Sequence, residues 1–385
     1  MKSKKSKKYI ALGVFSLLFI LFGLFMPIPY YIEAPGDAFD LDEMITVESA
    51  DKSSDEKSVN KSSGGESANT SDNEKSASIS DNGKSANKKD QGSYSMTTIG
   101  ISQATPFSAI SGLLSYHDLV SEEEIFSGVE SGDQYDFIQN LYMKNSVDNA
   151  IQVAFQAAGA KYEVILRGVY VLEIMPESYF SGALEVGDLI TQVDEQAVTR
   201  SDDLIDYLAK KSPSDSVTLR FKRDEKEYEV TGDLMQLDTG KTGIGIALVD
   251  DSELKTSPKI DVNFGDIGGP SAGLLYSLYI YDQLTQGDLN GDLHVSGTGT
   301  INLDGSVGSI GGADKKVLAA DQAGADIFFV PSEDLSKELK GSYPDYKTNY
   351  EEALAAAKDI GTKMKIVPVA HFKDAVDYLK QLKKK

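Results

Sequence analysis

The chain has 385 residues, and its 38 Lys and Arg against 60 Asp and Glu give a formal net charge of −22. A surface this acidic argues against a nucleic-acid partner, because phosphate binding needs a basic footprint. The absence of cysteine excludes disulfides, thiolate metal sites and cysteine nucleophiles. Since single domains usually run to roughly 100–200 residues, we expect two or three of them.

The first 26 residues carry a targeting pattern. Residues 9–26 are uncharged and nearly all apolar, which is about the minimum length for a helix that crosses the hydrocarbon core of a membrane. Several lysines precede them: Lys2, Lys4, Lys5, Lys7 and Lys8. The pattern predicts a cytoplasmic basic tail over 1–8, a transmembrane helix over 9–26 and an extracellular remainder, hence a single-pass protein of the cell membrane. A cleaved signal peptide is the alternative, but no small-x-small cleavage site follows the apolar run.

A linker and a connecting region follow. Residues 27–92 are predicted as an extracellular linker, whose low-complexity part, 49–92, is too poor in large apolar residues to fold. Residues 93–164 are predicted as a mixed α/β connecting region without assigned chemistry. His117 lies in that region, but no metal-binding histidine spacing accompanies it, and we expect no metal site.

A small α+β module is predicted over 165–238. An apolar strand begins near Gly168, a helix covers 202–211, and two strands follow at 216–221 and 227–231. This succession resembles a PDZ domain. The resemblance implies that an extended peptide is added as a strand between the 169–172 strand and the 202–211 helix. The predicted peptide-binding residues take the place of the carboxylate-binding loop: Gly168, Val169, Tyr170 and Val171. A module without a peptide ligand is the alternative.

A glycine-rich turn precedes an apolar helical run in the last third of the chain. The turn reads Gly268-Gly269-Pro270-Ser271-Ala272-Gly273. Proline suits a first helical position, and a serine at a helix start lies near unpaired N–H groups that can stabilise an oxyanion. The turn therefore predicts a nucleophilic Ser271. A glycine-rich helix start without chemistry is the alternative reading.

A nucleophilic serine needs a base, and two adjacent lysines follow at Lys315 and Lys316. A lysine with an ordinary pKa is neutral in only about one molecule in 2,500 at pH 7, so burial must lower its pKa. Lys316 is followed directly by an apolar run, which favours it over Lys315. Asp314 would oppose the lowering of that pKa if it faced Lys316.

The stretch from Thr298 to Gly312, continued to Ala320, together with the 269–273 turn, is similar to the proteolytic domain of Lon peptidases. The similarity implies an α/β catalytic fold over 241–385, with Ser271 as nucleophile and Lys316 as its partner. It further implies that Thr298 hydrogen-bonds the lysine. The turn residues Gly269, Pro270 and Ala272 are expected to support the serine. Lon enzymes commonly carry Asp at the position of Gly268, and this departure leaves the geometry of the loop open.

No G-x-x-x-x-G-K-[ST] motif occurs in this sequence, which argues against ATP dependence. The overall prediction is an α/β (α+β) protein with an N-terminal transmembrane helix, a PDZ domain and a Lon-type proteolytic domain. This order resembles the secreted, ATP-independent Lon-like proteases of Gram-positive bacteria, the SepM family. The resemblance implies a serine endopeptidase that cleaves exported peptides or proteins, in some members peptide pheromones. It implies no cofactor, a membrane contact through the anchor, and leaves homo-oligomerisation open.

Two other functions remain in view. The turn at Ser271 also satisfies G-x-S-x-G, so an α/β-hydrolase with His371 as base is one alternative. The 145 residues of 241–385 are few for such a sheet, and we expect His371 and His294 to be structural or surface residues. A membrane-tethered PDZ adaptor without catalysis is the other alternative.

Overall fold

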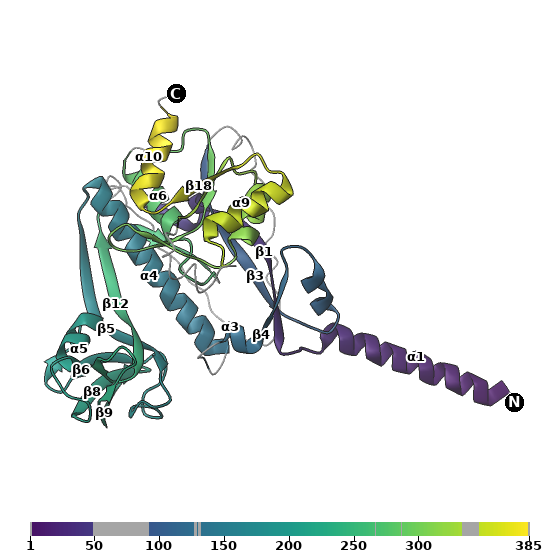
Figure 1. Ribbon diagram of the computed structural model, residues 1–385, viewed down its shortest axis with the longest axis horizontal. Coiled ribbons are helices and arrows are strands. Elements are labelled where there is room, and N and C mark those ends of the chain that lie inside the picture. Colours follow the sequence, from purple (N-terminus) through teal and green to yellow (C-terminus); the bar gives the residue numbers. More distant parts are fainter. Residues whose placement is uncertain are drawn as a thin grey trace, which may run out of the picture.

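The computed structural model describes residues 2–48, 92–126, 129, 132–265, 267–285, 287–332 and 346–383. The predicted spacer 49–92 lies outside these residues except for Gly92. Helix α1 (Lys2–Phe25) extends away from the body of the molecule (Figure 1). Among the described residues, none of the helices combines the length and apolarity needed to cross a membrane. The structure therefore gives no support to the predicted transmembrane helix over 9–26.

A six-stranded mixed sheet forms the centre of the larger unit. The strands lie in the order β18-β17-β14-β3-β1-β4. From β18 to β3 neighbouring strands are parallel, whereas β1 pairs antiparallel with both β3 and β4. The bounds of these strands are β1 (Tyr30–Asp40), β3 (Ser93–Gln103), β4 (Asp118–Ser121), β14 (His294–Gly297), β17 (Ile327–Pro331) and β18 (Lys365–Val369).

Helices cover both faces of this sheet, so the larger unit is a three-layer α/β/α structure. Strand β17 shows why: Ile327 and Phe329 belong to one apolar core, whereas Phe328 and Val330 belong to the other. A strand that is buried on both faces reads as a continuous apolar run rather than an alternating one. The helices of the first face are α4 (Gly132–Ala158), α6 (Gly273–Leu284) and α10 (Phe372–Leu382), and those of the second face are α7 (Ala313–Gln322) and α9 (Asn349–Ile360).

Residues 93–164 are an integral part of this unit. Strand β3 lies inside the sheet between β14 and β1, and α4 packs along α6. The segment between them holds the short 3-10 helix η2 (Ser108–Leu113), β4 and α3 (Glu122–Ile125). The region that the sequence leaves without a role thus supplies a central strand and a covering helix. Small elements complete the unit: α2 (Leu41–Met44), β2 (Ile45–Val47), β13 (Ile260–Val262), β15 (Thr300–Ile301) and β16 (Val307–Gly308).

A second sheet, with its own apolar core, forms the smaller unit. Its strands lie in the order β12-β5-β6-β8-β9, and helix α5 (Ser201–Leu208) packs on it through Leu204 and Leu208. The long β5–β12 ribbon runs from this unit to the larger one (Figure 1). The strands are β5 (Tyr162–Ile174), β6 (Leu189–Val193), β7 (Gln196–Ala197), β8 (Ser216–Arg223), β9 (Lys226–Asp233), β10 (Met235–Gln236), β11 (Thr242–Gly243) and β12 (Ile246–Thr256).

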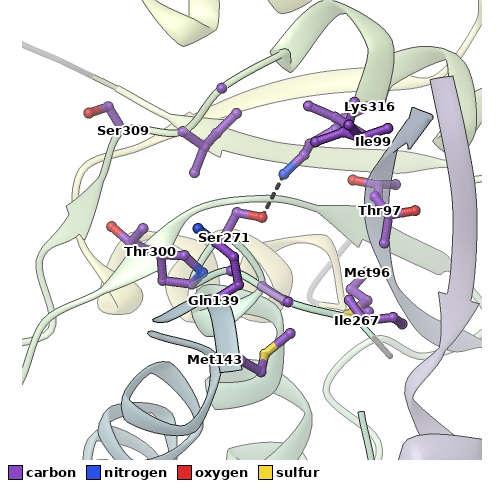
Figure 2. A pocket seen from close by; sticks show the side chains of 18 of the residues that line it. Met96, Thr97, Ile99, Gln139, Met143, Ile267, Ser271, Thr300, Ser309 and Lys316 are labelled. Atoms are coloured by element: carbon purple, nitrogen blue, oxygen red, sulfur yellow. Dashed lines mark hydrogen bonds between the residues drawn. The ribbon is translucent and has the colours of Figure 1, made fainter. Parts of the chain in front are cut away.

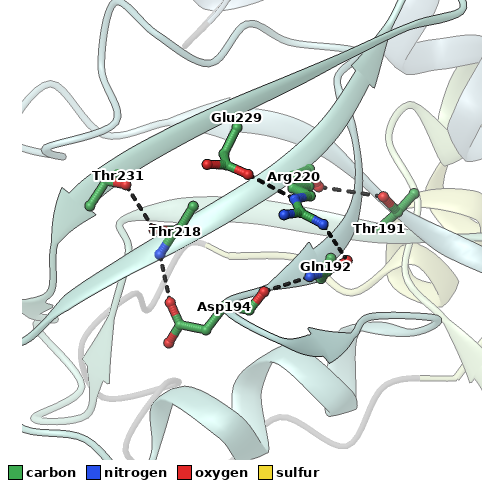
Figure 3. A network of polar contacts seen from close by, with 7 residues as sticks. All are labelled: Thr191, Gln192, Asp194, Thr218, Arg220, Glu229 and Thr231. Carbon is green, nitrogen blue, oxygen red and sulfur yellow. Dashed lines mark hydrogen bonds and ion pairs between the residues drawn. The ribbon is translucent and has the colours of Figure 1, made fainter.

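Polar contacts fix the turn between β6 and β7 against β8 (Figure 3). Asp194 has a positive φ of 49°, and its Oδ1 accepts a hydrogen bond from the backbone N–H of Thr218 at 2.8 Å. Its carbonyl oxygen accepts from the side chain of Gln192 at 2.6 Å. On the same face, Arg220 pairs with Glu229 at 2.7 Å across β8 and β9. The two contacts made by Asp194 compensate for a backbone conformation that few non-glycine residues adopt.

Candidate active site

Ser271 lies in the turn just before α6, two residues ahead of the first helical residue. Its carbonyl oxygen accepts hydrogen bonds from Gly299 N–H at 2.8 Å and from the Thr298 hydroxyl at 3.1 Å. Leu274 N–H in turn donates to the Gly299 carbonyl at 3.0 Å. The segment after β14 therefore holds the backbone of Ser271 while its side chain stays partly exposed.

The side-chain nitrogen of Lys316 lies within hydrogen-bonding distance of the Ser271 hydroxyl. The distance from Lys316 Nζ to Ser271 Oγ is 2.6 Å, and Figure 2 shows this contact inside a cleft. Lys316 Nζ also lies 3.1 Å from the Thr298 hydroxyl, which is fully buried. The structure thus brings together the three side chains that the sequence singles out, from the turn before α6, the segment after β14, and α7.

The environment of Lys316 favours its neutral form. The side chain is only 3% exposed, and burial lowers its pKa to about 7. A buried amine without a carboxylate partner pays a desolvation cost when it is protonated, so it loses its proton at a lower pH. At neutral pH a large share of the molecules can then accept the Ser271 proton.

Lys315 has the opposite environment. Burial by itself would lower its pKa, but the Asp118 carboxylate that it hydrogen-bonds, with the charges of Asp314 and Glu33, outweighs this effect and raises the pKa. Nζ of Lys315 lies 3.8 Å from Glu33 and 3.9 Å from Asp314. Asp314 therefore pairs with Lys315, and Lys315 remains a structural cation.

Helix α4 supports the turn that carries Ser271. The Gly269 N–H donates to the Gln139 carbonyl at 3.2 Å, and the Ser146 hydroxyl donates to the Pro270 carbonyl at 2.8 Å. A Cβ at Gly268 would lie 2.8 Å from the Cβ of Gln139, so the close approach of α4 explains the glycine at this position. Because Gly269 has φ of 90°, a side chain there would also be strained.

The cleft around Ser271 and Lys316 has a volume of about 680 Å³. Its walls combine turn residues with side chains that the sequence does not single out. Gln139 and Met143 come from α4, and Met96 and Ile99 come from β3 (Figure 2). Their role could not be read from the sequence, because no local motif marks them and only tertiary packing brings them to the serine.

The histidines lie away from this cleft. His371 caps α10 and lines a separate hollow of about 510 Å³, so it is not placed as a base for Ser271. His294 contacts Ser93 Oγ at 2.8 Å, and His117 contacts the Ser115 carbonyl at 3.0 Å. In the described part of the chain, no group of three or more His, Cys, Asp or Glu side chains could hold a metal ion.

The prediction that a peptide binds as an added strand along Gly168–Val171 is wrong. Strand β5 pairs with β6 through Val169 and Tyr170, and its other edge pairs with β12 through the same residues. Both hydrogen-bonding edges are therefore occupied, and no peptide strand can be added there. Strand β12 is the terminal strand of this sheet. Helix α5 lies beside it, since Asp250 of β12 accepts a hydrogen bond from Ser201 N–H at 2.7 Å.

Comparison with known proteins gives two family matches in this chain. Residues 128–234 match the PDZ domain family, and residues 256–377 match the Lon protease (S16) C-terminal proteolytic domain family. The chain is 29% identical to the Lon protease of Aster yellows witches'-broom phytoplasma over 106 residues, which are 28% of this chain. It is also 29% identical to the Lon protease of Clostridioides difficile over 156 residues, which are 38% of this chain. The matched segments span 11% and 18% of those proteins.

Among solved structures, the PDZ domain of an SdrC-like protein from Listeria monocytogenes is 34% identical. That similarity covers 23% of this chain and 93% of the Listeria domain, with a TM-score of 0.22. The two family matches show that the chain is a mixed α/β protein that carries a PDZ domain and a Lon-type C-terminal proteolytic domain. Its relatedness to Lon proteases supports a serine peptidase.

Proposed function

We propose that this protein is an ATP-independent serine endopeptidase in which Lys316 is the base for Ser271. The observation that carries the proposal is the 2.6 Å contact between Lys316 Nζ and Ser271 Oγ, made by a lysine that is almost fully buried. A noncatalytic scaffold has no need for a buried lysine without a carboxylate partner, because such a group costs stability. Nucleophile and base lie within direct proton-transfer distance.

The arrangement supports acyl transfer in two steps. The neutral amine of Lys316 takes the proton of the Ser271 hydroxyl as Oγ attacks the substrate carbonyl carbon. The resulting ammonium donates that proton to the leaving amine, the C–N bond breaks, and an acyl-Ser271 ester remains. Lys316 then takes a proton from water, which attacks the ester carbonyl carbon. The ester C–O bond breaks, the acid is released, and the Lys316 ammonium returns the proton to Ser271 Oγ. Thr298 keeps the amine aimed at Ser271 throughout, since its hydroxyl bonds both the Lys316 Nζ and the Ser271 carbonyl.

We propose further that the PDZ domain engages substrate along the free edge of β12 rather than along β5. Helix α5 flanks this edge, and Ile205 lies one helical turn after Ser201, on the face that meets β12. Its side chain is 48% exposed. An extended peptide added to β12 would gain backbone hydrogen bonds and could place an apolar side chain against Ile205.

We propose a location outside the cytoplasm, with exported peptides or proteins as substrates. The proposal rests on the lysines before residue 9 and on the uncharged stretch 9–26. Protease added to intact cells would digest an external protease domain and spare an internal one. Retention of the chain in the membrane fraction after alkaline extraction would test the anchor, and its release would contradict it.

A cleavage assay tests the proposed activity. Purified protein is incubated without ATP with an unfolded protein and with short peptides, beside Ser271→Ala and the matched control Ser309→Ala, whose serine also lines the cleft. We expect cleavage by the wild type and the control and none by Ser271→Ala. No cleavage by the wild type, or cleavage that needs ATP, would contradict the proposal, and the former would favour a PDZ adaptor.

A further inference from the structure

An exposed apolar surface lies where η2 meets the C-terminal end of α1. Leu113 is 87% exposed, Ile110 is 62% exposed and Leu114 is 58% exposed. In Figure 1 the η2 segment lies close to that end of α1, on the opposite side of the molecule from β8 and β9. Large apolar side chains grouped at this level of exposure mark an interaction surface.

The η2 segment is joined to α1 by direct contacts. The Phe107 N–H donates to the Gly23 carbonyl at 3.0 Å, and the Phe107 ring meets the Phe19 ring edge to face, with centroids 6.1 Å apart. A Cβ at Gly23 would lie 2.5 Å from the Phe107 ring, so the glycine permits this approach. The exposed apolar residues of both elements around this contact are here termed the apolar shoulder: Phe19, Phe22, Phe25, Ile110, Leu113 and Leu114.

The charge pattern around the apolar shoulder differs from that of the rest of the chain. A quarter of all residues are charged, yet residues 104–117, which join β3 to β4 through η2, contain no Asp, Glu, Lys or Arg. A loop that faced only water would have no reason to exclude charges in so acidic a protein. The exclusion fits an environment in which a charged side chain is costly, such as the boundary between lipid headgroups and acyl chains.

Several polar groups in the η2 segment are satisfied within the segment itself. The Thr105 N–H donates to Ser108 Oγ at 2.7 Å, and the Ser111 hydroxyl donates to the Ser108 carbonyl at 2.6 Å. Backbone contacts from Ala109 to Thr105 and from Leu114 to Ser111 close the turns. Internal satisfaction of polar groups is what a lipid environment demands, because water is not available there as a partner.

We propose that the apolar shoulder inserts into the outer part of a lipid bilayer and fixes the protease domain against its surface. The occupant is lipid rather than a second protein, because the surface continues directly from α1, whose large apolar side chains between Leu12 and Phe25 are exposed. The segment from η2 to β4 is also connected to the protease domain, because Tyr116 donates a hydrogen bond to Asp359 of α9 at 2.6 Å and Asp118 binds Lys315 of α7. This inference requires neither the proposed peptidase activity nor a helix that crosses the membrane.

A single tryptophan tests the inference, because the chain contains none. The full chain with Leu113→Trp is reconstituted with phosphatidylcholine vesicles, with or without bromine on the acyl chains, which quenches only fluorophores at acyl-chain depth. The matched control is Tyr179→Trp, which is 63% exposed in the smaller unit. We expect brominated lipid to reduce the emission of the 113 variant by about half or more and to leave the control unchanged.

Equal emission of the 113 variant in both lipids would overturn the inference, as would failure of the chain to sediment with the vesicles. A blue shift that appears without lipid and grows with protein concentration would assign the apolar shoulder to a second copy and would also overturn it. Replacing Ile110 and Leu114 with glutamate in the 113 variant should abolish the quenching, and persistence of the quenching would contradict the role of the shoulder. Peptide cleavage measured in the same samples reports the peptidase separately.

Discussion

Lys315 and Lys316 are consecutive residues of α7 and are both almost fully buried, but their side-chain nitrogens contact different kinds of groups. Lys315 lies among the carboxylates of Glu33, Asp118 and Asp314, whereas Lys316 meets the hydroxyls of Ser271 and Thr298. Adjacent helical residues point about 100° apart, so one lysine can be charged and form ion pairs while the next is neutral and acts as a base. The division between the two lysines underlies the proposed chemistry.

The pH dependence of cleavage should report Lys316. Because the amine must be neutral to accept the Ser271 proton, kcat/KM should rise with pH, be half-maximal near the Lys316 pKa of about 7, and then level off. Hydrolysis of a peptide without ionisable side chains, measured between about pH 5.5 and about pH 9, checks this. A rate that is flat across that range would contradict the assignment of the base.

Replacing each of the two lysines by methionine in turn should separate their roles. Lys316→Met should reduce kcat/KM by about 1,000-fold or more, since it removes the base. Lys315→Met should keep activity within about threefold but cost about 1–2 kcal/mol of folding free energy, because it leaves three carboxylates without their cation. Denaturant melts beside peptide hydrolysis measure both effects. Inactivity of a folded Lys315→Met variant with an active Lys316→Met variant would reverse the assignment.

Lys316→Met should also stabilise the protein, in a pH-dependent way. The native pKa of about 7 lies below the ordinary value of 10.5, so at or below pH 7 the wild type carries the full desolvation cost of this lysine. Between these two values the unfolded chain binds the extra proton, and the stability of the wild type rises with pH. We expect a gain of about 2 kcal/mol or more for the methionine variant at pH 7, shrinking towards pH 10. A variant that is less stable at pH 7 would count against this account.

Thr298→Val should weaken catalysis without weakening substrate binding. This change removes a hydroxyl that forms hydrogen bonds with the Lys316 Nζ and the Ser271 carbonyl. The amine of Lys316 is then no longer held in position towards Ser271. We expect kcat to fall about tenfold with little change in KM. The matched control is Thr97→Val, which removes another buried cleft hydroxyl, one that bonds the Gly297 carbonyl. Equal losses in both variants would reduce Thr298 to a packing role.

Ile205→Glu should separate long substrates from short ones. If β12 and α5 hold an extended segment of the substrate, a charge at this half-exposed position should lower kcat/KM for an unfolded protein about tenfold. Hydrolysis of a short peptide that does not reach the PDZ domain should stay unchanged. Tyr228→Glu on β9, at the other end of the sheet, is the control. If both substrates slow equally, the groove has no part in the mechanism.

The sequence was informative where chemistry is local. Ser271 could be selected from its glycine-rich turn and Lys316 from the apolar run that follows it, whereas Thr298 could be selected only through the resemblance to Lon peptidases. The support from Gln139 and Ser146 could not, since it arises from packing between segments more than a hundred residues apart in the chain.

The peptide-binding edge shows a second limit. The apolar alternation around Val169 correctly indicates a strand, but strand periodicity carries no information on which neighbour pairs with either edge. Strand β12 occupies the edge that the sequence leaves free for a peptide, and only the sheet order reveals this. For the same reason β3, which lies in a region without motifs, could not be assigned to the centre of the larger sheet.

Covalent labelling tests the central claim most directly. A fluorophosphonate reacts with a serine hydroxyl that a neighbouring base activates, and mass spectrometry of the digested protein locates the adduct. The account predicts an adduct on Ser271 in the wild type at pH 8, about 100-fold slower labelling in Lys316→Met, and unchanged labelling in Lys315→Met. An adduct on another serine, or undiminished labelling of Ser271 in Lys316→Met, would contradict it.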